Sequence, residues 1–151
     1  MSVCIDHISV YLPEKTLSNA ELAIAFNQEE ERIFKSTHIS KRYISGEDEL
    51  SSDMAVKAAI NFFNETNINR SDIDFLIFCS EGFDYIAPAS SCIIQHKLGL
   101  PTSIGCFDLP YGCSGYVYGL GLGYGLLKAG IAKKILFLTA DIPSKGIADN
   151  D

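Results

Sequence analysis

The residue with the clearest chemical potential is Cys113, which stands between glycines in the stretch from Asp108 to Gly119, where a strand pattern gives way to a helix pattern. A thiol in such a turn meets the partial positive charge and unpaired amides of a helix N-terminus, which favour the nucleophilic thiolate. The same amides are suited to holding the oxyanion of a tetrahedral intermediate during acyl transfer. Gly112 and Gly115 permit a tight turn and leave room for a substrate beside the sulfur. The pattern predicts a covalent nucleophile.

The other four cysteines are interpreted as small buried hydrophobic residues, which is the usual role of a free cysteine: Cys4, Cys79, Cys92 and Cys106. From the residues alone, that packing role stays open for Cys113 as well. Five cysteines are an odd number, and the chain has no CxxC pair, so the sequence predicts neither a disulfide framework nor a structural zinc site. We expect reduced thiols in a cytoplasmic protein.

Other polar residues offer weaker candidates for a site. The histidines at 7, 38 and 96 show no HExxH or other metal-ligand spacing and are interpreted as structural. Glu81 and Asp84 follow an apolar strand at its carboxyl end, where α/β proteins often place their sites. A carboxylate pair without further context is more often part of a solvated loop, and we expect that role here.

Glycines recur in the helix pattern that follows Cys113. Each interior glycine costs roughly 1 kcal/mol relative to alanine, so something must compensate. Gly115, Gly119 and Gly123 lie four residues apart on one face, which predicts that another backbone approaches there. They form no GxGxxG fingerprint, and dinucleotide binding is therefore disfavoured.

Composition excludes several classes of function. The chain has 151 residues, 47% of them hydrophobic, and a net charge of -7, which fits one globular domain spanning residues 1–151. Its basic residues are scattered, so no nucleic-acid partner is expected. The most apolar run, residues 116–132, contains a lysine and five glycines and is too short for a convincing membrane span. The first residues lack the pattern of a signal peptide.

The elements that position Cys113 alternate between strand and helix. A capping box at Ser18 and Glu21 predicts the start of a short helix, and Gly99 is the predicted end of another. Residues 27–44 are interpreted as an irregular surface excursion with a helical turn near 30–34. Strand patterns cover residues 3–12, 74–79, 103–109 and 134–139, and helix patterns cover 55–63, 88–98 and 114–129. This order predicts an α/β layered domain with a parallel sheet.

The segment around Cys113 resembles that of β-ketoacyl-acyl carrier protein synthase III and its thiolase-superfamily relatives. Their nucleophile lies in an Ala-Cys-Ser-Gly stretch, and residues 112–115 read Gly-Cys-Ser-Gly. Four further segments are similar to family motifs and follow in family order: 37–42 (Thr-Gly-Ile-x-x-Arg in the family), 72–77 (Asp-Ile-Asp), 84–90 (Asp-Tyr-x-x-Pro-Ser) and 129–141 (a helix exit and strand).

This resemblance implies a thiolase-like α/β fold, specifically one incomplete βαβαβαβ half of a duplicated layered architecture. The glycine-lined helix would then be central between two sheets. The implied reaction loads an acyl group from a thioester onto Cys113 and condenses it with malonyl-acyl carrier protein as carbon dioxide leaves. It implies an acyltransferase of fatty acid or polyketide synthesis, a homodimer without cofactor, and acyl carrier protein and coenzyme A or carrier-protein thioesters as partner and substrates.

Three departures from the family pattern modify this expectation. The family's catalytic His and Asn, and its Gly-Asp-Gly-Ala strand, would lie beyond Asp151, so these 151 residues alone are not expected to condense substrates. Where some members stack the coenzyme A adenine on a tryptophan and an arginine, this chain has Arg32 and Ser36 and no tryptophan, which favours a carrier-protein donor or an unusual starter. Ala87 stands where some members place an aromatic ring in the acyl pocket, which favours an acyl group longer than acetyl.

Two alternative functions stay open. One is acyl transfer from Cys113 to a hydroxyl or amine without carbon-carbon bond formation. The other is a non-catalytic thiolase-like subunit that dimerises or binds carrier protein.

Overall fold

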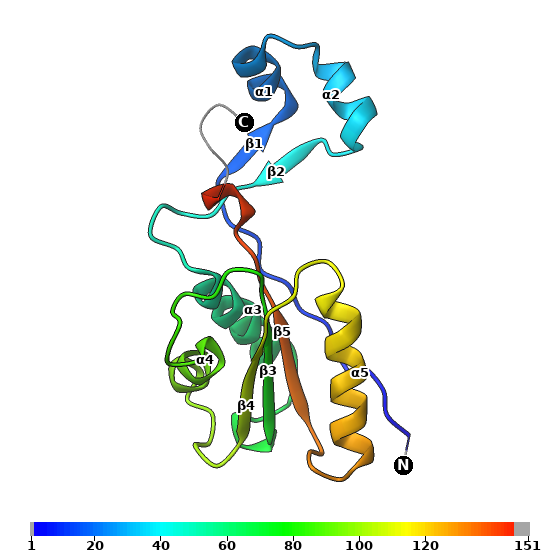
Figure 1. Ribbon diagram of the computed structural model, residues 1–151, viewed down its shortest axis with the longest axis vertical. Helices are drawn as coiled ribbons and strands as arrows, with labels where there is room; N and C mark the ends of the chain where they lie inside the picture. The colour runs from blue at the N-terminus through cyan, green and yellow to red at the C-terminus, as the bar shows by residue number, and fades with distance from the viewer. Residues whose placement is uncertain (1, 147–151) are drawn as a thin grey trace. The chain divides into compact units, whose positions relative to one another are not determined.

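The computed structural model describes residues 2–146 of the chain. These residues form two compact units (Figure 1). The sheet unit consists of residues 2–11 and 50–142, and the excursion unit consists of residues 12–49 and 143–146. Cys113 and all its neighbours discussed below belong to the sheet unit.

Three parallel strands in the order β4-β3-β5 form the centre of the sheet unit (Figure 1). β3 (Phe75–Cys79) pairs along its length with β4 (Gly105–Leu109) on one side and β5 (Ile135–Thr139) on the other. Its continuous apolar sequence is typical of a strand covered on both faces. Three of the four predicted strands are therefore confirmed, and their carboxyl ends lie at the same edge of the sheet.

Helices cover both faces of this sheet (Figure 1). α3 (Ser51–Glu65) and α4 (Ser90–Leu98) pack on one face, and α5 (Gly115–Lys128) packs on the other. Alternate residues of β3 and β5 serve the two faces, as the strand period of two requires. Those in the core with α3 and α4 are Leu76, Phe78, Leu136 and Leu138, and those in the core with α5 are Ile77, Cys79, Ile135 and Phe137.

Helix boundaries follow local signals in the sequence. α1 (Asn19–Phe26) begins with the predicted capping box, in which Glu21 N donates to Ser18 Oγ at 3.2 Å and Ser18 N donates to a Glu21 carboxylate oxygen at 2.7 Å. The helical turn expected near residues 30–34 is the longer α2 (Glu30–Thr37). Gly99 ends α4 with φ 65°, a left-handed conformation that glycine adopts without strain. These predictions are confirmed.

The excursion unit is more regular than its sequence indicates. β1 (Thr16–Ser18) pairs antiparallel with β2 (Lys41–Tyr43). The buried Asn19 accepts a hydrogen bond from Arg42 Nη1 at 2.9 Å and donates one to the carbonyl of Ile39 at 2.7 Å. Strands of three residues are too short for a detectable alternation, so tertiary hydrogen bonds define them.

The strand predicted for residues 3–12 is wrong, because no strand is found among residues 2–12. This segment is tied to α3 by side chains: Asn61 Nδ2 donates to the carbonyl of Val10 at 2.9 Å, and His7 Nε2 lies 3.0 Å from a Glu65 carboxylate oxygen. Its large apolar side chains stay exposed, namely Ile5, Ile8, Val10 and Leu12. A β-prone sequence becomes a strand only where a backbone partner meets it. The βαβαβαβ order therefore lacks its first strand here.

Two 3₁₀ turns, η1 (Arg70–Asp72) and η2 (Pro143–Lys145), complete the described elements. No helix in residues 2–146 combines the length and the apolar character that crossing a membrane requires.

Candidate active site

Cys113 lies in the turn between the end of β4 and the start of α5. Gly115 N donates to the carbonyl of Gly112 at 2.7 Å, which closes the turn. Cys113 is exposed, two residues before the helix. The amides of Cys113 and Ser114 donate to no acceptor within residues 2–146. The expected position of the thiol at a helix start is therefore confirmed, whereas its catalytic role stays a prediction.

The glycines on one face of α5 bring the helix close to the sheet. Three of them are buried: Gly115, Gly119 and Gly123. A Cβ on Gly115 would overlap the sulfur of Cys79, and a Cβ on Gly119 would overlap the ring of Phe137. The sequence predicted a close approach at this face, and the approach is confirmed. The expected partner was wrong, because side chains of β3 and β5 fill the space rather than another backbone.

Cys79 of β3 contacts the turn that carries Cys113. Its Sγ donates to the carbonyl of Tyr111 at 3.1 Å, and burial raises the pKa of its thiol. Burial also raises the pKa of Cys106 to about 11, with smaller contributions from Cys92 and Asp108. These two thiols are inert packing residues, as expected.

Cys4 and Cys92 contradict the packing prediction because both are exposed. Cys4 belongs to the segment that forms no strand, so no layer covers it. Cys92 lies on α4, where its neighbour Ser91 is buried and Cys92 faces outward. Free cysteine is commonly buried, but the face of an element decides each case.

Carboxylates gather at the carboxyl ends of the strands. A single oxygen of Asp141, after β5, accepts from Ser80 Oγ at 2.9 Å and from Glu81 N at 2.7 Å. The side chain of Glu81 lies against Gly112, because a Cβ on that glycine would overlap the carboxylate. The sequence placed Glu81 in a solvated loop and missed this contact. The signal was available, since parallel pairing of β3 and β4 brings their carboxyl ends together.

Asp84 has a structural role that its sequence context did not reveal. Its Oδ1 lies 3.2 Å from Ser51 Oγ and 3.4 Å from Ser52 N, at the first turn of α3. Ser51 Oγ also donates to the carbonyl of Gly82 at 2.8 Å. Asp84 thereby attaches the loop between β3 and α4 to the start of α3, where a negative charge is stabilising. The expectation of a solvated carboxylate was wrong for Asp84.

The two predicted substrate-binding residues lie in different units. Ala87 is exposed in the β3–α4 loop of the sheet unit. Arg32 is exposed on α2 of the excursion unit, and Ser36 on the same helix donates its hydroxyl to the carbonyl of Ile33 at 3.0 Å. Their roles stay predictions. Among the described residues, no three His, Cys, Asp or Glu side chains gather as a metal site would require.

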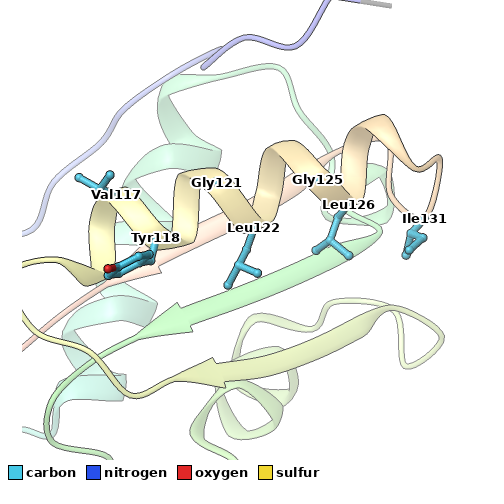
Figure 2. A pocket seen from close by; sticks show the side chains of 7 residues that line it. All are labelled: Val117, Tyr118, Gly121, Leu122, Gly125, Leu126 and Ile131. Carbon is cyan, nitrogen blue, oxygen red and sulfur yellow. The ribbon is translucent and has the colours of Figure 1, made fainter.

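An open apolar groove of about 470 Å³ runs along α5, where the side chains of Leu122 and Leu126 point toward the sheet (Figure 2). Its lining residues are Val117, Tyr118, Gly121, Leu122, Gly125, Leu126 and Ile131. Cys113 does not line it, so the groove is separate from the thiol. Tyr118, one of these lining residues, packs against Tyr111 in the turn that carries Cys113. The centroids of the two rings are 5.3 Å apart.

Several known proteins are similar to this chain. A family model described as 3-oxoacyl-[acyl-carrier-protein (ACP)] synthase III matches residues 107–151, which include Cys113. β-Ketoacyl-[acyl-carrier-protein] synthase III of Fusobacterium nucleatum is 35% identical over 144 residues, which are 95% of this chain and 44% of that protein. Synthase III 1 of Vibrio parahaemolyticus is 38% identical over 137 residues, 89% of this chain and 42% of that protein.

Solved structures agree with the sequence relatives. One crystal structure of a 3-oxoacyl-(acyl-carrier-protein) synthase III superposes with a TM-score of 0.95 at 40% identity and covers 97% of this chain and 44% of that one. The synthase III of Pseudomonas aeruginosa gives a TM-score of 0.86 at 30% identity, with 95% and 43% covered. The predicted thiolase-like α/β fold is therefore confirmed. This chain spans less than half the length of these relatives.

Proposed function

Because this chain is a relative of the β-ketoacyl-acyl carrier protein synthase III enzymes in sequence and in fold, we propose that Cys113 is the nucleophile that accepts an acyl group from a thioester. One observation carries the proposal: an exposed thiol lies two residues before α5, in a turn whose neighbouring amides have no acceptor in the described chain.

The geometry of the turn suits both parts of acyl loading. The thiolate of Cys113 attacks the thioester carbonyl and forms a new carbon-sulfur bond. The bond to the donor sulfur breaks, and the departing donor thiolate takes up the proton that Cys113 had released. The unengaged amides of Cys113 and Ser114 are available to the oxyanion of the tetrahedral intermediate. Close packing of Gly115 on the Cys79 sulfur supports the turn that presents these amides.

For the complete protein, we propose the condensation that gives the relatives their names. Malonyl-acyl carrier protein would lose carbon dioxide, and the resulting carbanion would attack the acyl group on Cys113. A carbon-carbon bond would form while the bond from the acyl carbon to the Cys113 sulfur breaks and frees the thiolate. By resemblance, the His and Asn that promote this step would come from polypeptide outside the 151 residues. The protein would act in the cytoplasm in fatty acid or polyketide synthesis, without a cofactor.

A homodimer belongs to this proposal. β4 is an outer strand of the sheet, so one row of its backbone groups has no strand partner among residues 2–146. Proteins usually cover or pair such an edge. Pairing with the same strand of a second copy would cover it, and sedimentation of the full-length protein measures whether two copies associate.

Intact mass spectrometry tests the nucleophile directly. The full-length protein is incubated with acetyl-coenzyme A or with an acyl carrier protein thioester, and we expect the mass of one acyl group to be added. Cys113→Ala removes the adduct. Cys92→Ala is the matched control, because Cys92 is equally a free exposed thiol but lies on α4, and it keeps the adduct. An adduct that survives in Cys113→Ala refutes the assignment, and no adduct with any donor favours a non-catalytic binding subunit.

The lack of a tryptophan to accompany Arg32 bears on which thioester loads Cys113. With Arg32 but no tryptophan in the chain to stack on adenine, we propose that carrier-protein thioesters load Cys113 faster than coenzyme A thioesters do. Loading rates with the same acyl group on both donors decide the question. A strong preference for coenzyme A contradicts this part of the proposal.

The size of the acyl group follows from Ala87. A methyl side chain leaves more room than an aromatic ring, so we propose a group longer than acetyl. In the full-length protein, Ala87→Phe is expected to shift loading toward acetyl and to reduce loading of longer chains, with Ala87→Val giving an intermediate profile. An unchanged chain-length profile in Ala87→Phe rules out a role for this position.

A further inference from the structure

Glu81 presents a carboxylate beside the residue that precedes the nucleophile. Its exposed side chain lies against the Cα of Gly112, so close that a Cβ there would overlap the carboxylate unless the Glu81 side chain moved. Successive Cα atoms are about 3.8 Å apart, so the carboxylate lies within roughly 7 Å of the Cys113 Cα. Asp141 fixes the Glu81 backbone by accepting its N–H at 2.7 Å. The backbone that carries the Glu81 side chain is therefore held in place beside the turn.

Among residues 2–146, no cation pairs with this carboxylate, and its oxygens form no hydrogen bond there. Lys35, Lys97 and Lys134 pair with Glu31, Asp53 and Asp72. An anionic carboxylate offers no positive charge with which to hold a thiolate, so we assign Glu81 no part in loading. After loading, the acyl group on sulfur is neutral, and a nearby carboxylate can take up a proton from an acceptor.

Relying on the proposed acylation of Cys113, we propose that Glu81 is the general base of a transfer step to an acceptor that carries a removable proton on oxygen, nitrogen or carbon. The acceptor atom bonds to the acyl carbon while its proton moves to the Glu81 carboxylate. The bond from the acyl carbon to the Cys113 sulfur breaks, and the departing thiolate recovers the proton from Glu81. Atoms and charge balance without any further reagent.

Unlike the decarboxylative condensation, this transfer step requires a general base from the protein. A malonyl acceptor generates its carbanion by losing carbon dioxide, so it requires no base. An acceptor with an intact O–H, N–H or C–H bond does require one, placed within hydrogen-bond distance of the proton. A carboxylate within roughly 7 Å of the Cys113 Cα is near enough for such an acceptor to contact both residues.

Water is the simplest acceptor and serves as the probe. Full-length protein is loaded with an acetyl thioester and freed of excess donor, and loss of the adduct in water at pH 7 is followed by intact mass. In Glu81→Gln, which keeps the size of the side chain, we expect loss to slow by about 100-fold. Loading is expected to be unchanged or faster. Glu30→Gln on α2 is the control and keeps the wild-type lifetime, because no contact of its side chain is found in the structure.

Hydroxylamine separates a base from a merely structural residue. It attacks thioesters as a neutral amine with little need of a base, so it should remove the acetyl group at equal rates from wild-type protein and Glu81→Gln. Equal slowing with water and with hydroxylamine means that the substitution only distorts the turn, and the inference is then wrong. Equal lifetimes in water overturn it as well.

Two further outcomes remain distinct. If wild-type protein forms no adduct at Cys113, the proposed function itself fails, independently of Glu81. If Glu81→Gln does not fold, as judged by its melting transition, Glu81→Asp takes its place. That variant keeps the charge but withdraws it by one methylene, and an unchanged lifetime of its adduct would refute the role of Glu81.

Discussion

Asp108 of β4 caps the helix that precedes it in the chain, because its Oδ2 accepts a hydrogen bond from Ser90 N at 2.7 Å. The second carboxylate oxygen accepts from Ser91 N, also at 2.7 Å. The hydroxyls of both serines are buried without a partner in the described chain. The carboxylate, rather than the serine side chains, therefore supplies the cap of α4 and fixes the end of the loop that carries Ala87.

Removing this cap should destabilise the fold. We expect Asp108→Ala to lower the free energy of unfolding by about 1–2 kcal/mol, because two amides lose their acceptor and the helix loses a favourable charge. The stability of Asp108→Asn should lie between those of wild type and Asp108→Ala, since one side-chain oxygen remains as an acceptor. Urea denaturation measures the effect, and Asp48→Ala, at an exposed loop position, is the control. Equal stability of Asp108→Ala and the control contradicts the capping role.

Alanine substitutions on the two glycine-bearing faces of α5 should change the stability of the protein in opposite directions. Gly119→Ala places a methyl group against the ring of Phe137 and is expected to cost about 1–3 kcal/mol of stability. Gly121 has nothing within 4 Å of the same position, so Gly121→Ala should raise stability by up to about 1 kcal/mol through helix propensity. Thermal melts of both variants check this. The packing is wrongly assigned if both substitutions stabilise.

Thiol reactivity should divide the five cysteines by burial. At pH 7.5, iodoacetamide is expected to label the exposed Cys4, Cys92 and Cys113, whereas Cys79 and Cys106 resist. Raising the pH to 9 should label Cys106 little more, because its pKa is about 11 and the thiol is still protonated. Peptide mapping by mass spectrometry identifies the labelled sites, with protein unfolded in urea as the positive control. Labelling of Cys79 as fast as Cys113 would contradict the structure.

The start of α3 should make stability depend on pH through Asp53. Burial raises the pKa of this carboxyl, but hydrogen bonds from Lys97 Nζ at 2.6 Å and Leu50 N at 3.1 Å outweigh it, and the net pKa lies below the ordinary value of 3.8. Because the folded pKa is depressed, the stabilisation is complete above the unfolded pKa and disappears as pH falls through the folded one.

Asp53→Asn should therefore be less stable than wild type at pH 7, by about 1 kcal/mol or less for a partly exposed carboxylate. The difference should vanish at a pH below the folded pKa, where both side chains are uncharged. Urea titrations at neutral and strongly acidic pH measure it. A difference of the same size at both pH values would show that the charge of Asp53 is not responsible.

Local patterns in the sequence determined much of this protein. The capping box at Ser18 and the left-handed Gly99 were predictable because each acts within one helical turn of its own residue. The strands around Phe75–Cys79 were predictable because a fully buried strand is apolar throughout. The position of Cys113 in a turn before a helix was predictable because its immediate neighbours form that turn. Its role as a nucleophile stays a proposal.

Only the tertiary structure decided which side chains meet across elements. Parallel strands bring Glu81 and Gly112 to the same edge of the sheet, but only the folded structure shows that the Glu81 side chain rests on Gly112. Nothing near Asp108 in sequence indicates that it caps Ser90. Residues 3–12 have the composition of a strand and form none, because a strand depends on a partner's backbone. Propensity and periodicity report on contacts between near neighbours in the chain. Contacts over larger separations follow from sheet register and helix packing, which exist only once the chain is folded.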